Sequence, residues 1–264
     1  MAASSDDLAL ALDLADVADS ITRARFRASD LVVETKPDLT PVTEADKAVE
    51  RALRDSLGAA RADDAIVGEE YGASEGASED GRRWIIDPID GTKNYVRGIP
   101  VWATLLALQE GGQTVAGVVS APALGRRWWA ARGVGAFALD LLSAEPRRLR
   151  VSAVSALADA QLCISGFDGW EEHGRLEGLL SLARRCWRTR GFGDFWSYML
   201  IAEGVAEIGC EPVVSLWDLA APQVIVEEAG GTFTDLAGVR TAAGGDALAT
   251  NGLLHEQALA LVGR

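Results

Sequence analysis

The sequence has few cysteines and histidines, which excludes several kinds of site. Its three cysteines, Cys163, Cys186 and Cys210, are odd in number, widely separated and in no CxxC pair. This pattern argues against a disulfide framework and against a thiolate zinc site. With only two histidines, His173 and His255, reactions that need several imidazoles are mostly excluded. We expect both histidines to be structural or surface residues rather than ligands.

The sequence also lacks long apolar runs and an excess of positive charge. No stretch reaches the roughly 20 uninterrupted apolar residues that a membrane span needs. Residues 1–7 are acidic and have neither the basic nor the apolar region of a secretory signal. The 25 basic and 39 acidic residues give a net charge of −14, which repels nucleic-acid phosphates and anionic lipids. We therefore expect a cytoplasmic protein whose partners are neither nucleic acids nor membranes.

The remaining composition is that of a globular protein with a sizeable core. Of the 264 residues, 48% are hydrophobic and 24% are charged. A chain of this length forms one large domain or two closely packed lobes, because a single core stops growing at roughly 250–300 residues. No internal repeat or obvious linker divides it. A change of pattern near residues 140–150 predicts lobes at 1–145 and 146–264.

Apolar periodicity predicts alternating helices and sheets. Helical spacing predicts an amphipathic helix over residues 6–27, and Thr43 with Asp46 forms a capping-box pattern that begins a second helix. Short apolar runs predict strands of one sheet at 84–86, 102–108, 115–120 and 127–131. Further helices are expected at 175–185, 195–203 and 219–229, and further strands at 161–165, 205–209 and 231–234. This order predicts a layered α+β or α/β sandwich.

Segment 84–94, WIIDPIDGTKN, is the densest chemical signal. An apolar strand delivers Asp87 at its end, Pro88 forces a turn, and Asp90 follows, so both carboxylates can face one point. Gly91 and Thr92 then open a helix, whose first amides can bind an anion. The alternative is that both aspartates only cap a turn and a helix.

Two other acidic segments are ambiguous when each is taken alone. Glu69 and Glu70 follow a short apolar run, and exposed loop acids are usually solvated. Asp218 stands just before an apolar helical segment, where its simplest role is that of an N-cap. Neither segment by itself indicates a site.

Together, the three segments resemble a known family. GEE at 68–70, WIIDPIDGTKN at 84–94 and WDLAAPQVIVEEAGG at 217–231 occur in the order and approximate spacing of the inositol monophosphatase-like family of metal-dependent phosphatases. The resemblance extends over essentially the whole chain. It implies an αβαβα layered sandwich, a homodimer and a small phosphate ester as substrate.

The resemblance also assigns roles to individual residues. The implied metal ligands are Glu69, Asp87, the carbonyl of Ile89, Asp90 and Asp218. The implied catalytic residues are Glu69 and Thr92, which orient the attacking water, with Asp46 and Thr43 behind them, although capping remains an alternative for the last two. Asp90, Gly91 and Thr92 would also contact the phosphate. An all-oxygen donor set suits Mg²⁺, and the number of acids around one phosphate suggests two or three ions per site.

Substrate choice is expected to depend on three residues outside the metal cluster. Asp194 puts a carboxylate where the family carries a small neutral residue, and Glu211 matches a position that reaches the organic part of the substrate. Two acids favour a cationic alcohol over a neutral polyol. Arg190 is expected to orient the phosphate or the acidic side chains, unless Arg190 and Asp194 form a surface ion pair.

Three longer segments resemble the histidinol-phosphate phosphatase branch of the family: DGTKNYVRGIPVWATL, RTRGFGDFWSYMLIAEG and ATNGLLHE. They imply hydrolysis of histidinol phosphate to histidinol and phosphate by metal-activated water, a step of histidine biosynthesis. One alternative is an inositol-1-phosphate or other small sugar phosphate phosphatase. The other is a non-catalytic binding or regulatory member, against which the intact acid set argues.

Four aromatic residues near Asp194 have two interpretations. Phe192, Phe195, Trp196 and Tyr198 could form an imidazole-binding wall. We expect most of them to belong to the core or to a subunit contact, because aromatic side chains usually bury large areas.

Overall fold

The computed structural model describes residues 5–37, 39–143 and 145–263, so residues 1–4, where no signal sequence is expected, lie outside it. It confirms both N-terminal helices, α1 (Ser5–Arg25) and α2 (Glu44–Ala60), and the paired strands β1 (Val33–Thr35) and β2 (Pro41–Thr43) come between them in the sequence. Thr43 caps α2 with the predicted capping box to Asp46. The local sequence signal therefore sets the start of α2 correctly.

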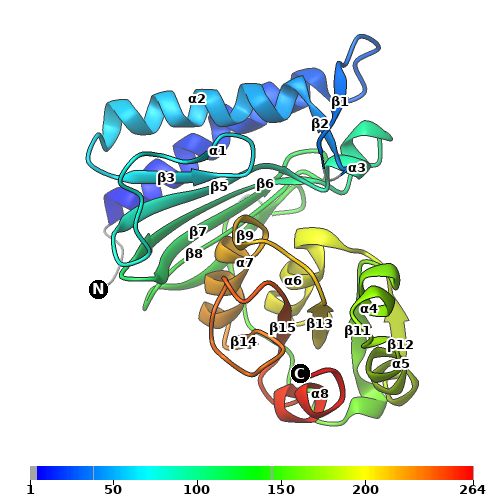
Figure 1. Cartoon of the computed structure of the whole chain (residues 1–264). Helices are drawn as coiled ribbons and strands as arrows, with labels where there is room; N and C mark the ends of the chain where they lie inside the picture. The colour runs from blue at the N-terminus through cyan, green and yellow to red at the C-terminus, as the bar shows by residue number, and fades with distance from the viewer. Residues whose placement is uncertain (1–4, 38, 144, 264) are drawn as a thin grey trace.

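A mixed sheet of eight strands in the described residues forms the larger half of the molecule (Figure 1). Its order is β10-β9-β8-β7-β6-β5-β3-β4, and its pairs are antiparallel except for β3 with β5. The strands are β3 (Ala65–Gly68), β4 (Gly72–Ala73), β5 (Arg82–Asp90), β6 (Ala103–Glu110), β7 (Gln113–Ala121), β8 (Arg126–Ala131), β9 (Gly135–Asp140) and β10 (Arg147–Arg148). The four strands predicted from Trp84 onward are confirmed as neighbours in one sheet.

The smaller sheet has the order β12-β11-β13-β15-β14. Its strands are β11 (Gln161–Cys163), β12 (Arg188–Arg190), β13 (Ile208–Glu211), β14 (Thr232–Thr234) and β15 (Ala247–Thr250). The helices of this half are α4 (Asp168–Glu172), α5 (Leu176–Arg185), α6 (Asp194–Ala202), α7 (Leu216–Glu228) and α8 (His255–Val262), and a short 3₁₀ turn spans Leu157–Asp159. Helix α3 (Thr92–Val96) follows β5.

The two sheets and three helical layers give the expected αβαβα sandwich (Figure 1). Helices α1 and α2 pack on one face of the larger sheet through a buried cluster that includes Leu14, Leu53 and Trp84. Helices α6 and α7 lie between the sheets, and α5 and α8 cover the outer face of the smaller one. Gly117 of β7 lets α7 approach closely, because an added Cβ would lie 3.0 Å from the Cα of Ala221.

Several predicted elements need correction. The strand predicted at 84–86 continues to Asp90, so Pro88 lies inside β5 and not in a turn. The strand predicted at 205–209 begins three residues later, because residues 203–207 complete the turn that follows α6. The other strands, β1 to β4, β9, β10, β12 and β15, and helices α4 and α8 were not predicted, because their apolar runs are absent or too short to show a period.

The chain passes from the larger sheet to the smaller one between β10 and β11. The predicted lobes 1–145 and 146–264 stay a prediction. Among the helices of the described residues, none has the length and apolar character needed to span a membrane.

Candidate metal centre and substrate cavity

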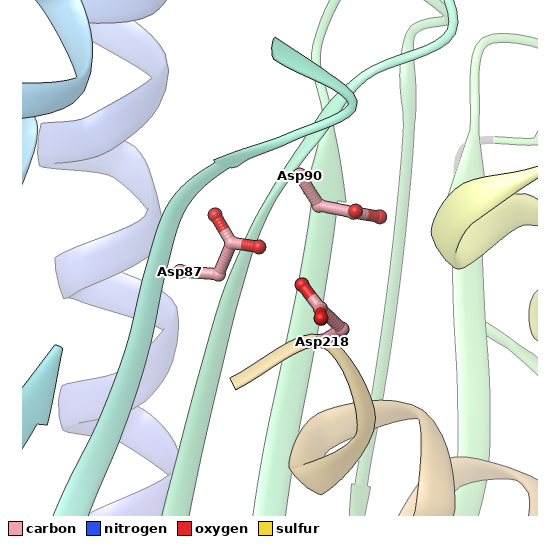
Figure 2. Close-up of side chains that lie close together, drawn as sticks. All are labelled: Asp87, Asp90 and Asp218. Carbon is pink, nitrogen blue, oxygen red and sulfur yellow. The ribbon is translucent and has the colours of Figure 1, made fainter. Parts of the chain in front are cut away.

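Three carboxylates from two distant segments converge between the sheets. Asp87 and Asp90 come from the end of β5, and Asp218 comes from the first turn of α7 (Figure 2). One carboxylate oxygen from each lies within 4.8 Å of the others. This spacing suits a shared cation with oxygen ligands.

A bulge in β5 makes this convergence possible. In a regular strand, residues three apart point to opposite faces of the sheet. Asp87 pairs with Leu105 and Asp90 pairs with Ala103, so three steps along β5 face two along β6. The extra residue turns both carboxylates toward the same side. Pro88 suits the bulge because it has no N–H to donate to the ladder.

Asp218 has a different local role from the one expected. The N-cap of α7 is Ser215, and Asp218 is the third helical residue, whose Oδ2 accepts the Ser215 backbone N–H at 2.8 Å. The helix therefore begins three residues before the predicted start. The capping bond uses one carboxylate oxygen and fixes the direction in which the side chain points.

Burial raises the pKa values of all three carboxyls, and nearby carboxylates add to the effect. Burial is the main cause at Asp87 and Asp90, and the neighbouring carboxylates add to it, so both pKa values lie well above 3.8. Burial likewise raises the pKa of Asp218 to about 6. The Asp87 Oδ1 atom is buried without a hydrogen-bond partner. A bound cation would supply that partner and remove the repulsion.

These raised pKa values predict an unusual pH dependence for the cation-free protein. Asp218 titrates near 3.8 when unfolded and near 6 when folded, so the folded state binds more protons between these values and its stability falls as pH rises through them. In EDTA, we expect the thermal midpoint to fall as the pH rises from about 4 to about 6, the range between the two pKa values of Asp218. Asp218→Asn should make the thermal midpoint depend less on pH. An equal dependence of the thermal midpoint on pH in the wild type and in Asp218→Asn would contradict the prediction.

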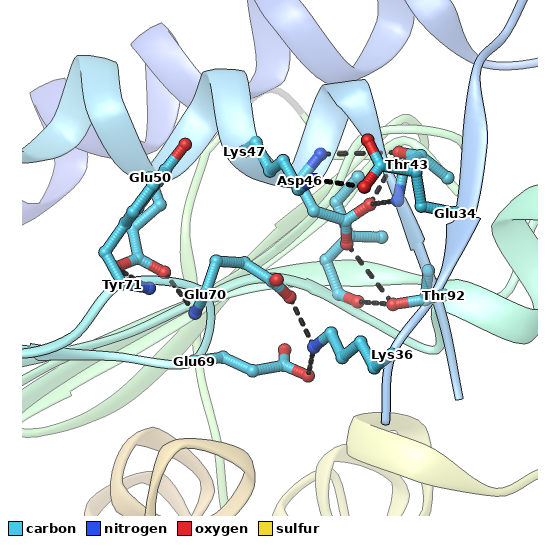
Figure 3. A network of polar contacts seen from close by, with 11 residues as sticks. Glu34, Lys36, Thr43, Asp46, Lys47, Glu50, Glu69, Glu70, Tyr71 and Thr92 are labelled. Carbon is cyan, nitrogen blue, oxygen red and sulfur yellow. Dashed lines mark hydrogen bonds and ion pairs between the residues drawn. The ribbon is translucent and has the colours of Figure 1, made fainter. Parts of the chain in front are cut away.

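Glu69 lies beside the cluster, but its carboxylate is held by a lysine. Lys36 Nζ, between β1 and β2, donates to Glu69 Oε1 at 2.7 Å and to Glu70 Oε1 at 2.6 Å (Figure 3). Burial lowers the pKa of Lys36, but its bonds to the two carboxylates outweigh burial and raise the pKa above 10.5. Glu69 is close enough to raise the pKa of Asp87. Rotation of Glu69 away from the ammonium would add it to the three-carboxylate cluster.

Thr43, Asp46 and Thr92 form a continuous hydrogen-bonded chain (Figure 3). Asp46 Oδ2 accepts the backbone N–H of Thr43 at 2.8 Å and its hydroxyl at 2.5 Å. The Thr92 hydroxyl lies 3.3 Å from Asp46 Oδ1 and 2.9 Å from the Ile89 carbonyl oxygen. Burial raises the pKa of Asp46 to about 6. Thr43 and Asp46 therefore cap α2 and also contact a predicted site residue, so the two interpretations are compatible.

A cavity of about 740 Å³ opens beside the carboxylates. Its lining includes predicted site residues from both halves of the chain: Glu69, Asp90, Gly91, Thr92, Asp194, Glu211 and Asp218. Gly91 has a φ of 81°, and an added Cβ would lie 3.3 Å from Asp194 Oδ2. The backbone at the start of α3 therefore needs glycine, both for its conformation and for space.

The two acids expected to choose the substrate both line this cavity. Ser165 donates its hydroxyl to Glu211 Oε1 at 2.5 Å, and Asn94 donates its amide to Asp194 Oδ2 at 3.1 Å. Burial raises the pKa of Asp194 to about 6 and that of Glu211 to about 7. These two residues add two further carboxylates to the cavity wall, and Asp194 is close enough to Asp90 to raise the pKa of Asp90.

Arg190 is placed differently from the other predicted residues. Its side chain is exposed at the end of β12, and Nη1 donates to the Thr189 carbonyl at 2.9 Å. It is absent from the cavity lining, and among the described residues no ion pair joins it to Asp194. The alternative ion pair is therefore not formed among the described residues, and the orienting role of Arg190 stays a prediction. Gly191, the next residue along the chain, does line the cavity.

The nearby aromatic residues are mainly core residues, as expected. Phe195 and Tyr198 are buried, and Phe192 packs on Trp196 with ring centroids 5.1 Å apart. Phe192, Phe195 and Tyr198 also line part of the cavity. His255 is buried between hydroxyls of the smaller sheet, and His173 is exposed after α4. Neither histidine lines the cavity.

Three polar residues at the site were not singled out from the sequence: Lys36, Ser165 and Asn94. Asn94 stands in the segment WIIDPIDGTKN but had no assigned role. Lys36 lies in a polar segment without periodicity, and Ser165 ends the predicted strand 161–165, whose apolar pattern assigns no role to its hydroxyl. Their partners are 33 and 46 residues away, so no local signal could have identified these contacts.

Comparison with known proteins relates this geometry to one family. A model of the inositol monophosphatase family matches residues 4–264. The chain is 57% identical over 258 residues to the histidinol-phosphatase of Streptomyces coelicolor, with 96% of each protein covered. It is 57% identical over 256 residues to the histidinol-phosphatase of Mycobacterium tuberculosis, with 97% of each covered. A solved structure of extragenic suppressor protein suhB from Bartonella henselae has a TM-score of 0.87 at 30% identity, with 98% of both chains covered.

Proposed function

This chain belongs to the inositol monophosphatase family, and from this premise we propose that it is a Mg²⁺-dependent phosphomonoesterase that hydrolyses histidinol phosphate to histidinol and phosphate. The observation that carries the proposal is one cavity in which two further carboxylates accompany the cation cluster. Asp90 and Asp218 line the cavity and share the cluster with Asp87, and Asp194 and Glu211 are the two further carboxylates. The similarity to two histidinol-phosphatases supports the choice of substrate. The inositol phosphate alternative is not favoured.

The donor set fits the divalent metal on which the family depends. We propose that Glu69, Asp87, the Ile89 carbonyl, Asp90 and Asp218 hold two or three Mg²⁺ ions. The unpartnered Asp87 Oδ1 and the raised pKa values support this assignment, since an all-oxygen site suits Mg²⁺. When bound, the ions would supply Lewis acidity toward the phosphate and make water more acidic.

The protein's own groups would position water and phosphate. We propose that Thr92 Oγ1 accepts a hydrogen bond from the attacking water while donating its own proton to Asp46 Oδ1, 3.3 Å away. Asp46 is kept in place by its two bonds from Thr43. Glu69 would orient the same water. The amides of Gly91 and Thr92 stand at the start of α3, which has no side-chain cap, and would donate to phosphate oxygens.

Asp194 and Glu211 would bind the cationic part of the substrate. An ammonium between two carboxylates gains charge-assisted hydrogen bonds that a neutral polyol does not. We propose that Asp194 contacts the ammonium and that Glu211, oriented by Ser165, contacts the imidazole or the amine. The orienting role of Arg190 stays a prediction, because its exposed side chain is not part of the cavity lining.

Asp194→Asn is expected to impair histidinol phosphate hydrolysis selectively. The change removes the charge while keeping a residue that tolerates the φ of 51° found at this position. We expect kcat/KM for histidinol phosphate to fall by about 10–100-fold, as for loss of a hydrogen bond to a charged group. Activity on inositol 1-phosphate serves as the internal control and should change little. An equal loss on both substrates would remove Asp194 from the specificity argument.

A panel of phosphate esters tests the function itself. The purified protein with Mg²⁺ should hydrolyse histidinol phosphate much faster than inositol 1-phosphate, fructose bisphosphate or a phosphorylated nucleotide. A preference for inositol 1-phosphate would overturn the substrate assignment. Failure to hydrolyse any ester would favour a binding role.

Further parts of the proposal rest on the family resemblance and on charge. We propose a homodimer in the cytoplasm that acts in histidine biosynthesis and has lobes at 1–145 and 146–264. The net charge of −14 supports the absence of nucleic-acid and membrane partners.

A further inference from the structure

A buried glutamate outside the cavity contacts the turn that carries Glu69. Glu50 lies one helical turn after Asp46 on α2, and its side chain is 0% exposed. Its Oε2 accepts the backbone N–H of Glu70 at 2.7 Å, and its Oε1 accepts that of Tyr71 at 3.1 Å (Figure 3). Arg54 donates to Oε1 at 2.8 Å. Both carboxylate oxygens of Glu50 are therefore bonded.

These bonds fix the backbone on one side of Glu69, and β5 fixes the other side. The N–H of Glu69 itself donates to the Ile86 carbonyl at 3.1 Å. The next two amides along the chain, at Glu70 and Tyr71, donate to Glu50. Glu69 is thus held between β5 and α2, and its side chain can only reorient about its own bonds.

Gly68 shows how closely the strand passes over this carboxylate. A Cβ at this position would lie 2.1 Å from Glu50 Oε1 and 2.3 Å from its Cδ. The φ of Gly68 is not in the left-handed region, so glycine is required for space rather than for conformation. The end of β3 is therefore fitted to the buried glutamate.

A buried carboxylate is costly unless charge and hydrogen bonds compensate it. A residue that only joined α2 to β3 could be apolar, as Val49 and Leu53 are on the same buried face. Both oxygens of Glu50 instead accept hydrogen bonds from two consecutive amides, which fixes the position and direction of the turn. Such contacts behind a metal ligand orient it.

We propose that Glu50 is a positioning residue that acts through the 69–71 turn to hold Glu69 in reach of the cation site. The inference rests on the proposed function for the role of Glu69. Helix α2 then orients two parts of the site from adjacent turns, Thr92 through Asp46 and Glu69 through Glu50.

Glu50→Gln tests this role by Mg²⁺ binding. The carboxamide keeps the size of the side chain but offers only one acceptor oxygen, so one amide of the turn loses its partner. Titration calorimetry with Mg²⁺ should give an affinity about 10–100-fold weaker. In steady-state assays the Mg²⁺ needed for half-maximal rate should rise by a similar factor, while KM at saturating Mg²⁺ stays near that of the wild type.

Glu228→Gln is the matched control. Glu228 ends α7, about ten residues beyond Asp218, and its two oxygens accept the N–H groups of Gly133 at 2.8 Å and Gly135 at 2.9 Å. The same substitution therefore removes the same kind of turn contact far from the cation site. We expect its Mg²⁺ affinity to equal that of the wild type, even if its thermal midpoint falls.

Gly68→Ala perturbs the same contact from the other side and should also weaken Mg²⁺ binding. If Glu50→Gln does not fold, the Mg²⁺ affinity of Gly68→Ala tests the role of Glu50 instead. Wild-type Mg²⁺ affinity in the folded Glu50→Gln protein, or an equal loss in Glu228→Gln, would overturn the inference. Because the calorimetric comparison uses no substrate, it decides the role of Glu50 even if the protein proves inactive on histidinol phosphate.

Discussion

Asp90→Asn is expected to lower turnover of histidinol phosphate by about 10²–10³-fold or more, the range for loss of one preorganised electrostatic group at a reacting centre. Asp90 contributes one of the three converging carboxylates and also accepts the Phe195 backbone N–H at 2.6 Å. The substitution removes a charge from the cation site and places a possible N–H donor against that amide. Mg²⁺ binding, measured by calorimetry, should weaken together with turnover.

Asp246→Asn provides a control with the same change of side chain. Asp246 is also buried and accepts a backbone N–H, from Leu236 at 2.8 Å, but it does not line the cavity. We expect this variant to keep the Mg²⁺ affinity of the wild type. Near-wild-type kinetics in Asp90→Asn would refute the assignment of Asp90 as a metal ligand.

Removal of divalent cations with EDTA is expected to abolish hydrolysis completely, and added Mg²⁺ is expected to restore it. The buried carboxylates repel one another, as their raised pKa values indicate. Without cations, the phosphate would meet these negative charges directly. An ester dianion should therefore bind poorly to the stripped protein, and water would lack activation.

EDTA already saturated with Mg²⁺ is the control for effects of the chelator itself, and it should leave the rate unchanged. Thermal unfolding supplies a second measurement, because a ligand that binds only the folded state raises the midpoint. Full activity after exhaustive chelation would favour a mechanism without metal. A calorimetric stoichiometry of one ion would contradict the proposed two or three.

The sequence predicted contacts within one helical turn better than contacts between distant segments. The spacing of three residues between Thr43 and Asp46 predicted a capping box, and both hydrogen bonds of that box form at the start of α2. At α7 the same logic chose Asp218 as the cap, although Ser215 three residues earlier completes the pattern. Capping bonds lie within one turn of helix, so the sequence contains most of the information needed to predict them.

The β5 motif shows where local reasoning fails. The segment WIIDPIDGTKN correctly indicated that Asp87 and Asp90 face one point, but it predicted a turn. The structure reaches the same result with a bulge, because β6 continues beside β5 through Ala103. Whether a Pro-containing segment turns or stays in a sheet depends on the neighbouring strand, which the segment itself does not encode.

The sequence by itself determined the chemical groups of the site, the family and the layered architecture, because these follow from residue types, spacing and apolar patterning. Only the tertiary structure decided that Lys36 holds Glu69, that Arg190 lies outside the cavity lining, and that Glu50 accepts two amides of the 69–71 turn. Asn94 and Asp194 meet across 100 residues, and Asp90 meets the amide of Phe195 across 105. Contacts of that kind depend on how β5, α3 and α6 pack together, and packing is a property of the whole chain rather than of any segment.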